Sequence, residues 1–293
     1  MSLVVSGATA DTTQGTGEDM AIINGTSGND VLTAKTLQDQ FNGRSGDDMI
    51  TGSEGDDTIH GSAGDDWISG SAGNDTIIGG TGDDSISDGD GNDDVTAGEG
   101  NDFVLAGNGE DSFSGGKGFD TIDFSAAQAG LAVDMKLGTV SGQGNDTIKD
   151  FEKLIGTAFA DNIRGSSGDD IIEAGGGRNV IRGGAGNDDM SGGYRTDTFV
   201  WKSSDVVDQA TGASRGVDII RGFENNDVFD VRGLLKGVAY TDLDDVVRFT
   251  DTGAGTMLQV KMGGGFYDVA LLDNVHLGGP SATAYAADGI LLV

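Results

Sequence analysis

Hydrophobic residues recur at every ninth position through the first half of the chain. From Gly25 to Asp123, 99 residues divide without a gap into eleven units of nine, and the eighth place of every unit is apolar. These eighth-place residues are Leu32, Phe41, Ile50, Ile59, Ile68, Ile77, Ile86, Val95, Val104, Phe113 and Ile122. The last three places of a unit alternate outward, inward and outward, as in a half-buried strand. Each unit therefore predicts six residues of turn followed by three of strand.

The polar positions keep the same period. The sixth place is aspartate in all eleven units: Asp30, Asp39, Asp48, Asp57, Asp66, Asp75, Asp84, Asp93, Asp102, Asp111 and Asp120. The fourth place is glycine in every unit but one, where Leu37 stands. Glycine at the first, second and fourth places suits positive φ and close backbone approach in a tight turn. Two units then form one coil of 18 residues with a strand on each of two facing sheets, and neighbouring coils lie about 4.8 Å apart.

The period is interrupted and then returns. Residues 124–140 break it, SGQGNDTIK (141–149) restores it with Asp146, and five more units run from Gly156 to Val200. The sixth places of these five units are Asp161, Asp170, Asn179, Asp188 and Asp197. Asn179 keeps an oxygen but lacks the charge, which predicts a weaker cation site. We expect the interruption to follow the path of the solenoid as irregular extended coils.

Composition and charge narrow the possible partners. The 49 acidic and 17 basic residues give a formal net charge of −32. This charge argues against nucleic acid and anionic membranes, and favours cations or neutral partners. The chain has no cysteine, hence no disulfide or thiolate site, and no apolar run long enough for a membrane-spanning helix. Acidic, glycine-rich sequence often indicates disorder, but three positions in phase over 99 residues indicate an ordered repeat.

The stacked aspartates predict bound calcium. In coils of 18 residues Asp48 stacks on Asp66, and Asp57 stacks on Asp75. Two like charges about 4 Å apart repel by roughly 1 kcal/mol in water and by about 4 kcal/mol at an effective dielectric constant of 20. A hard divalent cation held by carboxylates and turn carbonyls removes this repulsion, and calcium tolerates the loose all-oxygen geometry better than magnesium. The fifth-place residues, such as Asp47 and Asp56, are predicted to face solvent.

The units resemble the nonapeptide repeats of RTX proteins. GGTGDDSIS (79–87) and GGAGNDDMS (183–191) match G-G-x-G-x-D-x-U-x at every defined place, and the resemblance covers residues 25–200. It implies an all-β fold, a right-handed parallel β-roll with a β-rich C-terminal capping region. It also implies multiple Ca²⁺ ions, each held by the sixth-place side chains of two stacked turns and by backbone carbonyls. The carbonyls are those of residues such as Arg44, Gly46, Gly52, Gly55, Gly61, Ala63, Gly64, Gly70, Gly73, Gly79 and Gly82.

The resemblance further implies export. RTX proteins leave the cell by type I secretion, unfolded in the low-calcium cytosol, and fold in calcium outside. The N-terminus lacks the features of a cleaved signal peptide, so we expect an extracellular protein with an uncleaved C-terminal signal. Residues 217–235 resemble the segment that closes many RTX rolls, with Asp218–Phe223 and Asp227–Val231 in the matching places. Residues 241–293 resemble a type I secretion target domain, and they also suit a cap over the open end of the roll.

The chain is thus expected to have five segments. They are a lead-in (1–24), a first block of repeats (25–123), an irregular insert with one repeat at 141–149 (124–155), a second block (156–200), and a C-terminal cap and target-like region (201–293).

Catalytic chemistry finds little support in the sequence. His60 occupies an outward ninth place, and His276 lies in the C-terminal region. The G-x-S-x-G match around Ser214 lacks the preceding strand that a nucleophile elbow requires, and HExxH is absent. We expect no enzyme activity and no catalytic residue in this chain.

Two functions remain open. The first is a complete, secreted calcium-binding protein with a structural or interaction role, which self-associates or contacts a cell-surface or matrix partner. The second is the C-terminal secretion and folding module of a larger enzyme such as a protease, a lipase or a polysaccharide epimerase. Met1 and the non-repeat residues that follow it favour the first.

Overall fold

The structure is a computed structural model that describes residues 11–13, 20–33, 38–208, 210–211, 213–224, 226–263, 265–277 and 291–292. The unusual turn at Leu37, Gly212 of the G-x-S-x-G match and the final Asp288-Gly-Ile lie outside these residues. The chain forms two compact units. The first contains Met1–Gln128 and Gly138–Ile155, and the second contains Ala129–Leu137 and Gly156–Val293.

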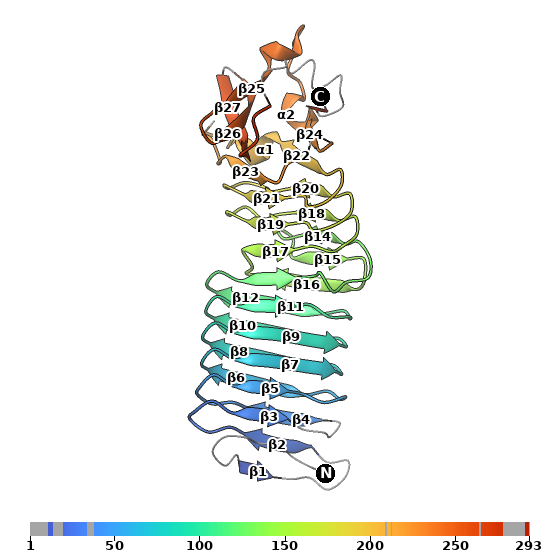
Figure 1. The fold of residues 1–293 in the computed structure, drawn as a ribbon, viewed down its shortest axis with the longest axis vertical. Helices are drawn as coiled ribbons and strands as arrows, with labels where there is room; N and C mark the ends of the chain where they lie inside the picture. The colour runs from blue at the N-terminus through green and yellow to red at the C-terminus, as the bar shows by residue number, and fades with distance from the viewer. Residues whose placement is uncertain are drawn as a thin grey trace. The chain divides into compact units, whose positions relative to one another are not determined.

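The first unit consists of two mainly parallel sheets, and successive repeats alternate between them (Figure 1). One sheet has the order β1 (Asp11–Thr13), β2 (Ala21–Asn24), β4 (Asp39–Asn42), β6 (Thr58–Ala63), β8 (Thr76–Thr81), β10 (Asp94–Glu99), β12 (Ser112–Lys117), β16 (Asn145–Lys149) and β15 (Thr139–Ser141). The other has the order β3 (Val31–Thr33), β5 (Met49–Thr51), β7 (Trp67–Ala72), β9 (Ser85–Asp90), β11 (Phe103–Leu105), β13 (Thr121–Asp123) and β17 (Lys153–Ile155).

The register confirms the coil of 18 residues. Ile50 pairs with Ile68 and Ile59 with Ile77, so each residue lies beside its equivalent one coil away. The eighth-place residues from Leu32 to Ile122 are all at most 1% exposed and fill the space between the sheets. Each such side chain contributes about 1.5–3 kcal/mol of hydrophobic stabilisation. The parallel β-roll predicted from the period is thereby confirmed.

The strands are longer than the period predicts. Strands β6 to β10 and β12 are six residues long, because pairing continues through the first three places of the next unit. The second and fourth places take positive φ, as at Ser62 (88°) and Gly64 (128°). The first-place glycine is needed for space instead. A Cβ on Gly61 would collide with the side chain of Asp66 and the carbonyl of Gly79.

The interruption contains an antiparallel pair. Strand β16, which carries Asp146, pairs in parallel with β12 and antiparallel with β15. A hairpin therefore replaces part of the irregular coil expected there.

The second unit also has two sheets. One has the order β14 (Ala132–Asp134), β18 (Asn162–Arg164), β20 (Val180–Arg182), β22 (Thr198–Lys202), β24 (Val228–Val231) and β28 (Leu291–Leu292). The other has the order β19 (Ile171–Glu173), β21 (Asp189–Ser191), β23 (Asp218–Arg221), β27 (Gly265–Asp273), β26 (Gly255–Met262) and β25 (Val247–Asp251). Three single turns of helix are α1 (Ser203–Val206), α2 (Arg232–Leu235) and the 3₁₀ turn Leu243–Asp245.

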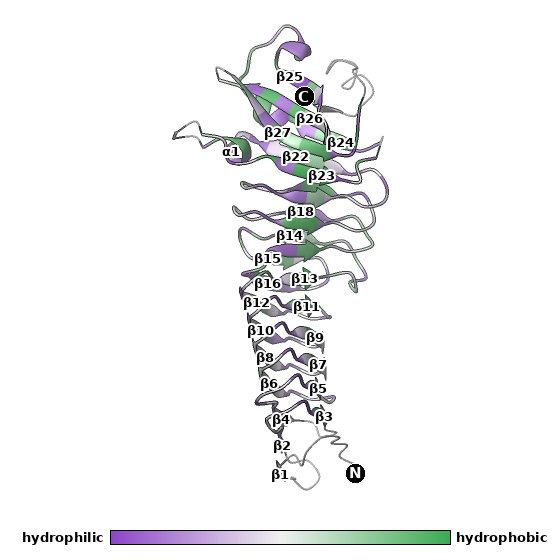
Figure 2. Ribbon diagram, turned by 60° about the vertical axis from the view of Figure 1, so that its left-hand side comes forward, coloured by the Kyte–Doolittle hydropathy of each residue, from purple (hydrophilic) through white to green (hydrophobic). Residues whose placement is uncertain are grey.

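The C-terminal strands extend this unit beyond the repeats, as the predicted β-rich C-terminal region requires. Strand β27 pairs in parallel with β23, while β25, β26 and β27 form an antiparallel meander. The inward residues here are larger: Trp201 and Phe229 are at most 1% exposed and lie in ring contact. Hydrophobic residues gather on strands β14, β18 and β23 (Figure 2). Within the described part of the chain, no helix is long and apolar enough to cross a bilayer.

Candidate calcium sites

The sixth-place carboxylates form two ladders along the first unit. The backbone N–H of each aspartate from Asp30 to Asp102 donates to Oδ1 of the aspartate 18 residues later, over 2.7–2.9 Å. One ladder contains Asp30, Asp48, Asp66, Asp84, Asp102 and Asp120, and the other contains Asp39, Asp57, Asp75, Asp93, Asp111 and Asp146. All but Asp146 are buried. The predicted pairs Asp48–Asp66 and Asp57–Asp75 are thus brought together.

The second carboxylate oxygen is left without a donor in many of these turns. Oδ2 is buried and has no hydrogen-bond partner among the described residues at Asp48, Asp66, Asp75, Asp84, Asp93, Asp102 and Asp120. A buried carboxylate oxygen without a donor or cation is costly, because its hydration has been lost without replacement. These orphaned oxygens therefore fit a bound cation.

A carbonyl oxygen of the next coil lies beside each orphaned oxygen. A Cβ on Gly61 would meet both Asp66 Oδ2 and the Gly79 carbonyl, and a Cβ on Gly43 would meet Asp48 Oδ2 and the Gly61 carbonyl. The gap that glycine leaves is thus lined by oxygens of two adjacent coils. An all-oxygen donor set is the one that calcium prefers.

The predicted carbonyl residues differ in their surroundings. The first-place carbonyls of Gly61, Gly70 and Gly79 lie by orphaned or ladder carboxylates, and Gly52 takes the same first-place position. The fourth-place carbonyls of Gly46, Gly55 and Gly64 lie against the fourth-place glycines Gly64, Gly73 and Gly82. The Ala63 carbonyl accepts a hydrogen bond from the Gly46 N–H over 2.9 Å, and Arg44 adopts a φ of 76°.

Comparison with known proteins agrees with this geometry. The family model of the RTX calcium-binding nonapeptide repeat (4 copies) matches residues 16–50, 24–59, 42–77, 51–86, 69–104, 87–122 and 155–190. The chain is an RTX calcium-binding nonapeptide repeat protein. RTX repeats typically bind Ca²⁺, and RTX repeat proteins are generally secreted.

Among solved structures, the chain is similar to the extracellular lipase LipA from Serratia marcescens, with 18% sequence identity and a TM-score of 0.29. The similarity covers 82% of this chain and 45% of the lipase chain, so this chain spans less than half of the lipase's length. No curated protein matches the sequence significantly.

The fifth-place residues of the RTX turns lie outside the ladders. Asp47, Asp56, Asp65 and Asn74 are exposed, as predicted. They form their own ladder in the opposite direction: the Asp65 N–H donates to Asp47 Oδ1 (3.1 Å), and the Asp83 N–H donates to Asp65 Oδ1 (2.8 Å). Each coil is therefore bonded to its neighbours through two adjacent side chains that point opposite ways.

Some RTX turns satisfy the carboxylate internally. The Ser53 N–H donates to Asp57 Oδ2 over 2.7 Å, and the Thr157 N–H donates to Asp161 Oδ2 over 2.8 Å. The second-place residues of these turns do not take the positive φ of Ser62 and Ser71, whose turns leave Oδ2 without a donor. The turn conformation thus decides which carboxylates are free for a cation.

Asp88 is a candidate ligand that sequence reasoning missed. It stands at a first place, where glycine is usual, and one ligand atom each of Asp88, Asp93 and Asp111 lie within 4.8 Å of one another. Asp88 is fully buried; its Oδ1 accepts the Gly107 N–H (2.9 Å), and its Oδ2 has no donor among the described residues. An acidic residue at a glycine position was the signal in the sequence. This turn therefore offers three carboxylates to one cation where its neighbours offer two.

Replacing Asp88 by glycine should weaken the calcium site at this turn. The consensus residue removes one of three negative ligands, so we expect an affinity loss on the order of tenfold at that site. Asp90→Gly is the matched control, because Asp90 is an exposed acid of the same unit. Titration against a competing calcium chelator measures both, and equal affinity of Asp88→Gly and wild type would rule out the third ligand.

The ladders continue in the second unit and run past the last repeat. Asp170 and Asp161 begin them, and the Asp188 N–H donates to Asp218 Oδ1 (3.1 Å) while the Asp197 N–H donates to Asp227 Oδ1 (2.9 Å). Asp218 and Asp227 were recognised as part of a closing segment but not as members of the ladders. Their sequence signal is an apolar residue two positions later, as in the repeats.

These last ladder members differ from the repeat aspartates. Asp218 Oδ2 accepts the Trp201 Nε1–H over 2.7 Å, and Asp227 Oδ2 accepts the Glu224 N–H over 2.8 Å. Asp188 and Asp197 keep a buried Oδ2 without a donor among the described residues. Protein donors thus take the place of a cation at the end of each ladder.

Asn179 shows how an amide can replace the cation. Its Nδ2 donates to the Gly192 carbonyl over 2.9 Å, and its Oδ1 accepts the Asp161 N–H over 2.9 Å. The amide thus bonds directly to a first-place carbonyl of the next coil. This contact is a physical reason for the weaker site predicted there.

Burial and mutual repulsion raise the pKa of the ladder carboxyls above the ordinary 3.8. Burial is the largest cause in each, with neighbouring carboxylates adding to it: the pKa of Asp48 is raised to about 6, those of Asp75 and Asp84 to about 7, and that of Asp88 to about 8. A calcium-free RTX roll therefore binds protons that its unfolded chain, near 3.8, releases.

Acid should stabilise the calcium-free fold. Folding takes up protons between about pH 4 and pH 8, so the free energy of unfolding without calcium falls as pH rises through the raised pKa values. We expect circular dichroism of the calcium-depleted chain to show more β structure at pH 5 than at pH 8. Calcium affinity should change in the opposite sense, because protons compete for the same oxygens. A calcium-free chain that loses structure on acidification from pH 8 to pH 5 would contradict this assignment.

Proposed function

We propose that this chain is a secreted RTX protein that folds on binding several calcium ions outside the cell and then serves a structural or interaction role, without catalytic activity. The buried Oδ2 oxygens without donors are the main support. At each such turn, two stacked carboxylates such as Asp48 and Asp66 would hold a cation together with first-place carbonyls such as that of Gly61. Calcium would supply the positive charge that lets these coils stack.

Outward apolar side chains on the second sheet of the first unit support an interaction role. Met49 is 48% exposed and Trp67 44%, and the two are direct neighbours on β5 and β7. A groove of about 450 Å³ runs beside them, lined by Val31, Met49 and Trp67 together with the fifth-place acids Asp47, Asp65 and Asp83. Apolar side chains bordered by charge are typical of contact surfaces for another protein.

Export is the first part of the proposal to test. We expect the full chain to reach the medium of cells that carry a type I exporter, and a chain without residues 241–293 to stay inside. The intact mass of the naturally secreted product is the companion measurement. A species much heavier than 29.7 kDa would favour the alternative, a secretion module of a larger enzyme.

The contact surface is the second part. Sedimentation velocity in calcium should show self-association, or a cell-binding assay should show surface retention, and Met49→Ser with Trp67→Ser should abolish it. Tyr194→Ser is the control, since Tyr194 is 80% exposed in the second unit. Unchanged association in the double variant would remove this surface from the proposal.

A further inference from the structure

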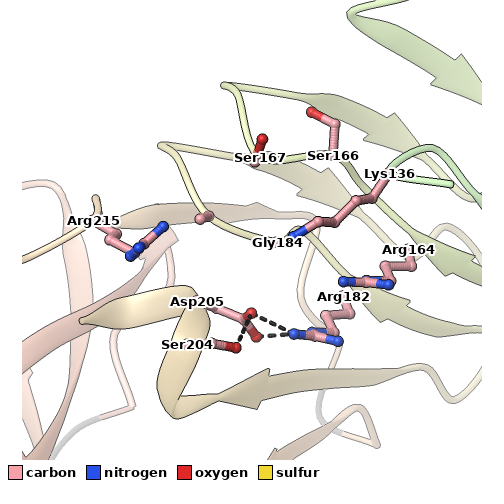
Figure 3. Close-up of a pocket in the computed structure, with 10 residues that line it drawn as sticks. Lys136, Arg164, Ser166, Ser167, Arg182, Gly184, Ser204, Asp205 and Arg215 are labelled. Atoms are coloured by element: carbon pink, nitrogen blue, oxygen red, sulfur yellow. Dashed lines mark hydrogen bonds and ion pairs between the residues drawn. The ribbon is translucent and has the colours of Figure 1, made fainter. Parts of the chain in front are cut away.

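A small cavity in the second unit gathers an unusual concentration of positive charge. Its volume is about 170 Å³, and its lining includes Lys136, Arg164, Arg182 and Arg215 (Figure 3). These are four of only 17 basic residues in a chain of net charge −32. They come from separate parts of the unit: Lys136 follows β14, Arg164 and Arg182 end β18 and β20, and Arg215 precedes β23.

One carboxylate lines the cavity, and it is already engaged. Asp205, at 7% exposure, accepts from Arg182 Nε (2.8 Å to Oδ2) and from Arg182 Nη2 (2.5 Å to Oδ1). It also accepts the Lys202 N–H over 2.8 Å. Asp205 therefore fixes the guanidinium of Arg182 in place, and the lining keeps an excess of three positive charges over its one negative charge.

The other cations are incompletely satisfied. Arg164 Nη1 donates to Asp134 Oδ2 (2.8 Å), but its Nε is buried and has no acceptor among the described residues. Lys136 forms no ion pair with any described residue, and its side chain extends across the cavity toward Gly184 (Figure 3). Arg215 pairs only with Asp208, which is not part of the lining. A buried N–H without an acceptor is costly, so an anion here would supply what the protein lacks.

The arrangement indicates the shape of that anion. Arg215 lies on one side of the cavity and Arg164 and Arg182 on the other, while Ser167 and Ser204 border it from two further directions (Figure 3). Donors that converge from several sides suit a tetrahedral oxyanion better than a flat carboxylate, which one guanidinium edge can satisfy. The volume is below the roughly 300–1,000 Å³ of pockets that enclose whole drug-sized ligands. It therefore fits one charged group rather than an entire molecule.

We propose that this cavity binds a single sulfate or phosphate group carried by a small ligand or by a larger molecule that contacts the second unit. Arg182, held by Asp205, and Arg164 supply fixed donors, and Lys136 closes over the group. The site is separate from the carboxylate ladders and attracts the opposite charge. It gives a strongly acidic protein one place where an anionic partner can bind.

Isothermal titration of the full, calcium-loaded chain at low ionic strength tests the proposal. The probes are glucose 6-sulfate, glucose 6-phosphate, galacturonate and uncharged glucose. We expect saturable 1:1 binding of at least one ester, at least tenfold tighter than galacturonate, with no binding of glucose. Whichever ester binds more tightly identifies the group. Absence of saturable binding, or galacturonate binding as tightly as both esters, would overturn the proposal.

Variants locate the binding. Lys136→Gln and Arg164→Gln should each weaken the preferred ester at least tenfold, whereas Lys236→Gln and Arg178→Gln remove the same charge outside the cavity and should leave binding within about twofold. Lys136 is exposed and unpaired, so its variant should keep the fold, which circular dichroism in calcium verifies. Equal losses in cavity and control variants would show that only net charge matters, and would also overturn the site.

Discussion

Chelation of calcium at neutral pH should cost the chain most of its β structure and expand it. The ladders place buried carboxylates one coil apart, and their unshared oxygens face carbonyl oxygens of the next coil. Without a cation, negative oxygens face negative oxygens along both edges of the first unit. The core offers little compensation, since each unit of nine residues buries one inward eighth-place side chain between the sheets while all nine must be ordered.

Far-UV circular dichroism and hydrodynamic radius, measured in chelator and then in millimolar calcium, check this expectation. We expect a largely unfolded spectrum that converts to a β spectrum with compaction when calcium is restored. Magnesium at equal concentration is the control and should be much less effective, because it resists loose coordination and loses its water reluctantly. A compact β spectrum in excess chelator at neutral pH would refute the assignment of the ladders to calcium.

Replacement of Asp66 by alanine should disturb two calcium sites at once. Asp66 Oδ1 accepts the Asp48 N–H, and the Asp66 N–H donates to Asp84 Oδ1, so this side chain takes part in the contacts with both neighbouring coils. We expect the bound calcium to fall by about two ions and the calcium concentration at the folding midpoint to rise on the order of tenfold.

The adjacent residue provides the matched control. Asp65→Ala removes the same charge from the same turn, but Asp65 is exposed and lies in the outer ladder. It should leave the calcium count unchanged and shift the midpoint only slightly. Equilibrium dialysis with a calcium-sensitive titration measures both variants. If Asp65→Ala and Asp66→Ala behave alike, the distinction between inner and outer ladders is wrong.

Much of the first unit follows from the period alone. An apolar residue at every eighth place and an aspartate at every sixth place can be satisfied together only by stacked coils. Ile59 therefore meets Ile77, and Asp57 meets Asp75. The exposure of the fifth place was predictable for the same reason, since each turn already has an inward acid.

Turn conformation was not predictable. Ser53 and Ser62 occupy equivalent second places after a glycine, yet Ser62 has a φ of 88° and leaves Asp66 Oδ2 free, while the Ser53 N–H donates to Asp57. Nothing in the residue type separates these turns, because contacts between coils decide the backbone. Asp88 escaped notice because attention to the sixth place hid an acid at the first. The cluster of Arg164, Arg182 and Arg215 could not be foreseen, since its members are 18 and 33 residues apart.

The two opposed ladders of side-chain hydrogen bonds have a consequence for the evolution of the gene. Every coil presents the same acceptors and donors above and below, so a duplicated or deleted stretch of 18 residues would meet its new neighbours without a change of register. A change of nine residues would also keep the ladders intact, but it would move every later side chain to the opposite sheet. The length of the roll can therefore vary freely between related genes, whereas the side that carries Met49 and Trp67 is preserved only when repeats are gained or lost in pairs.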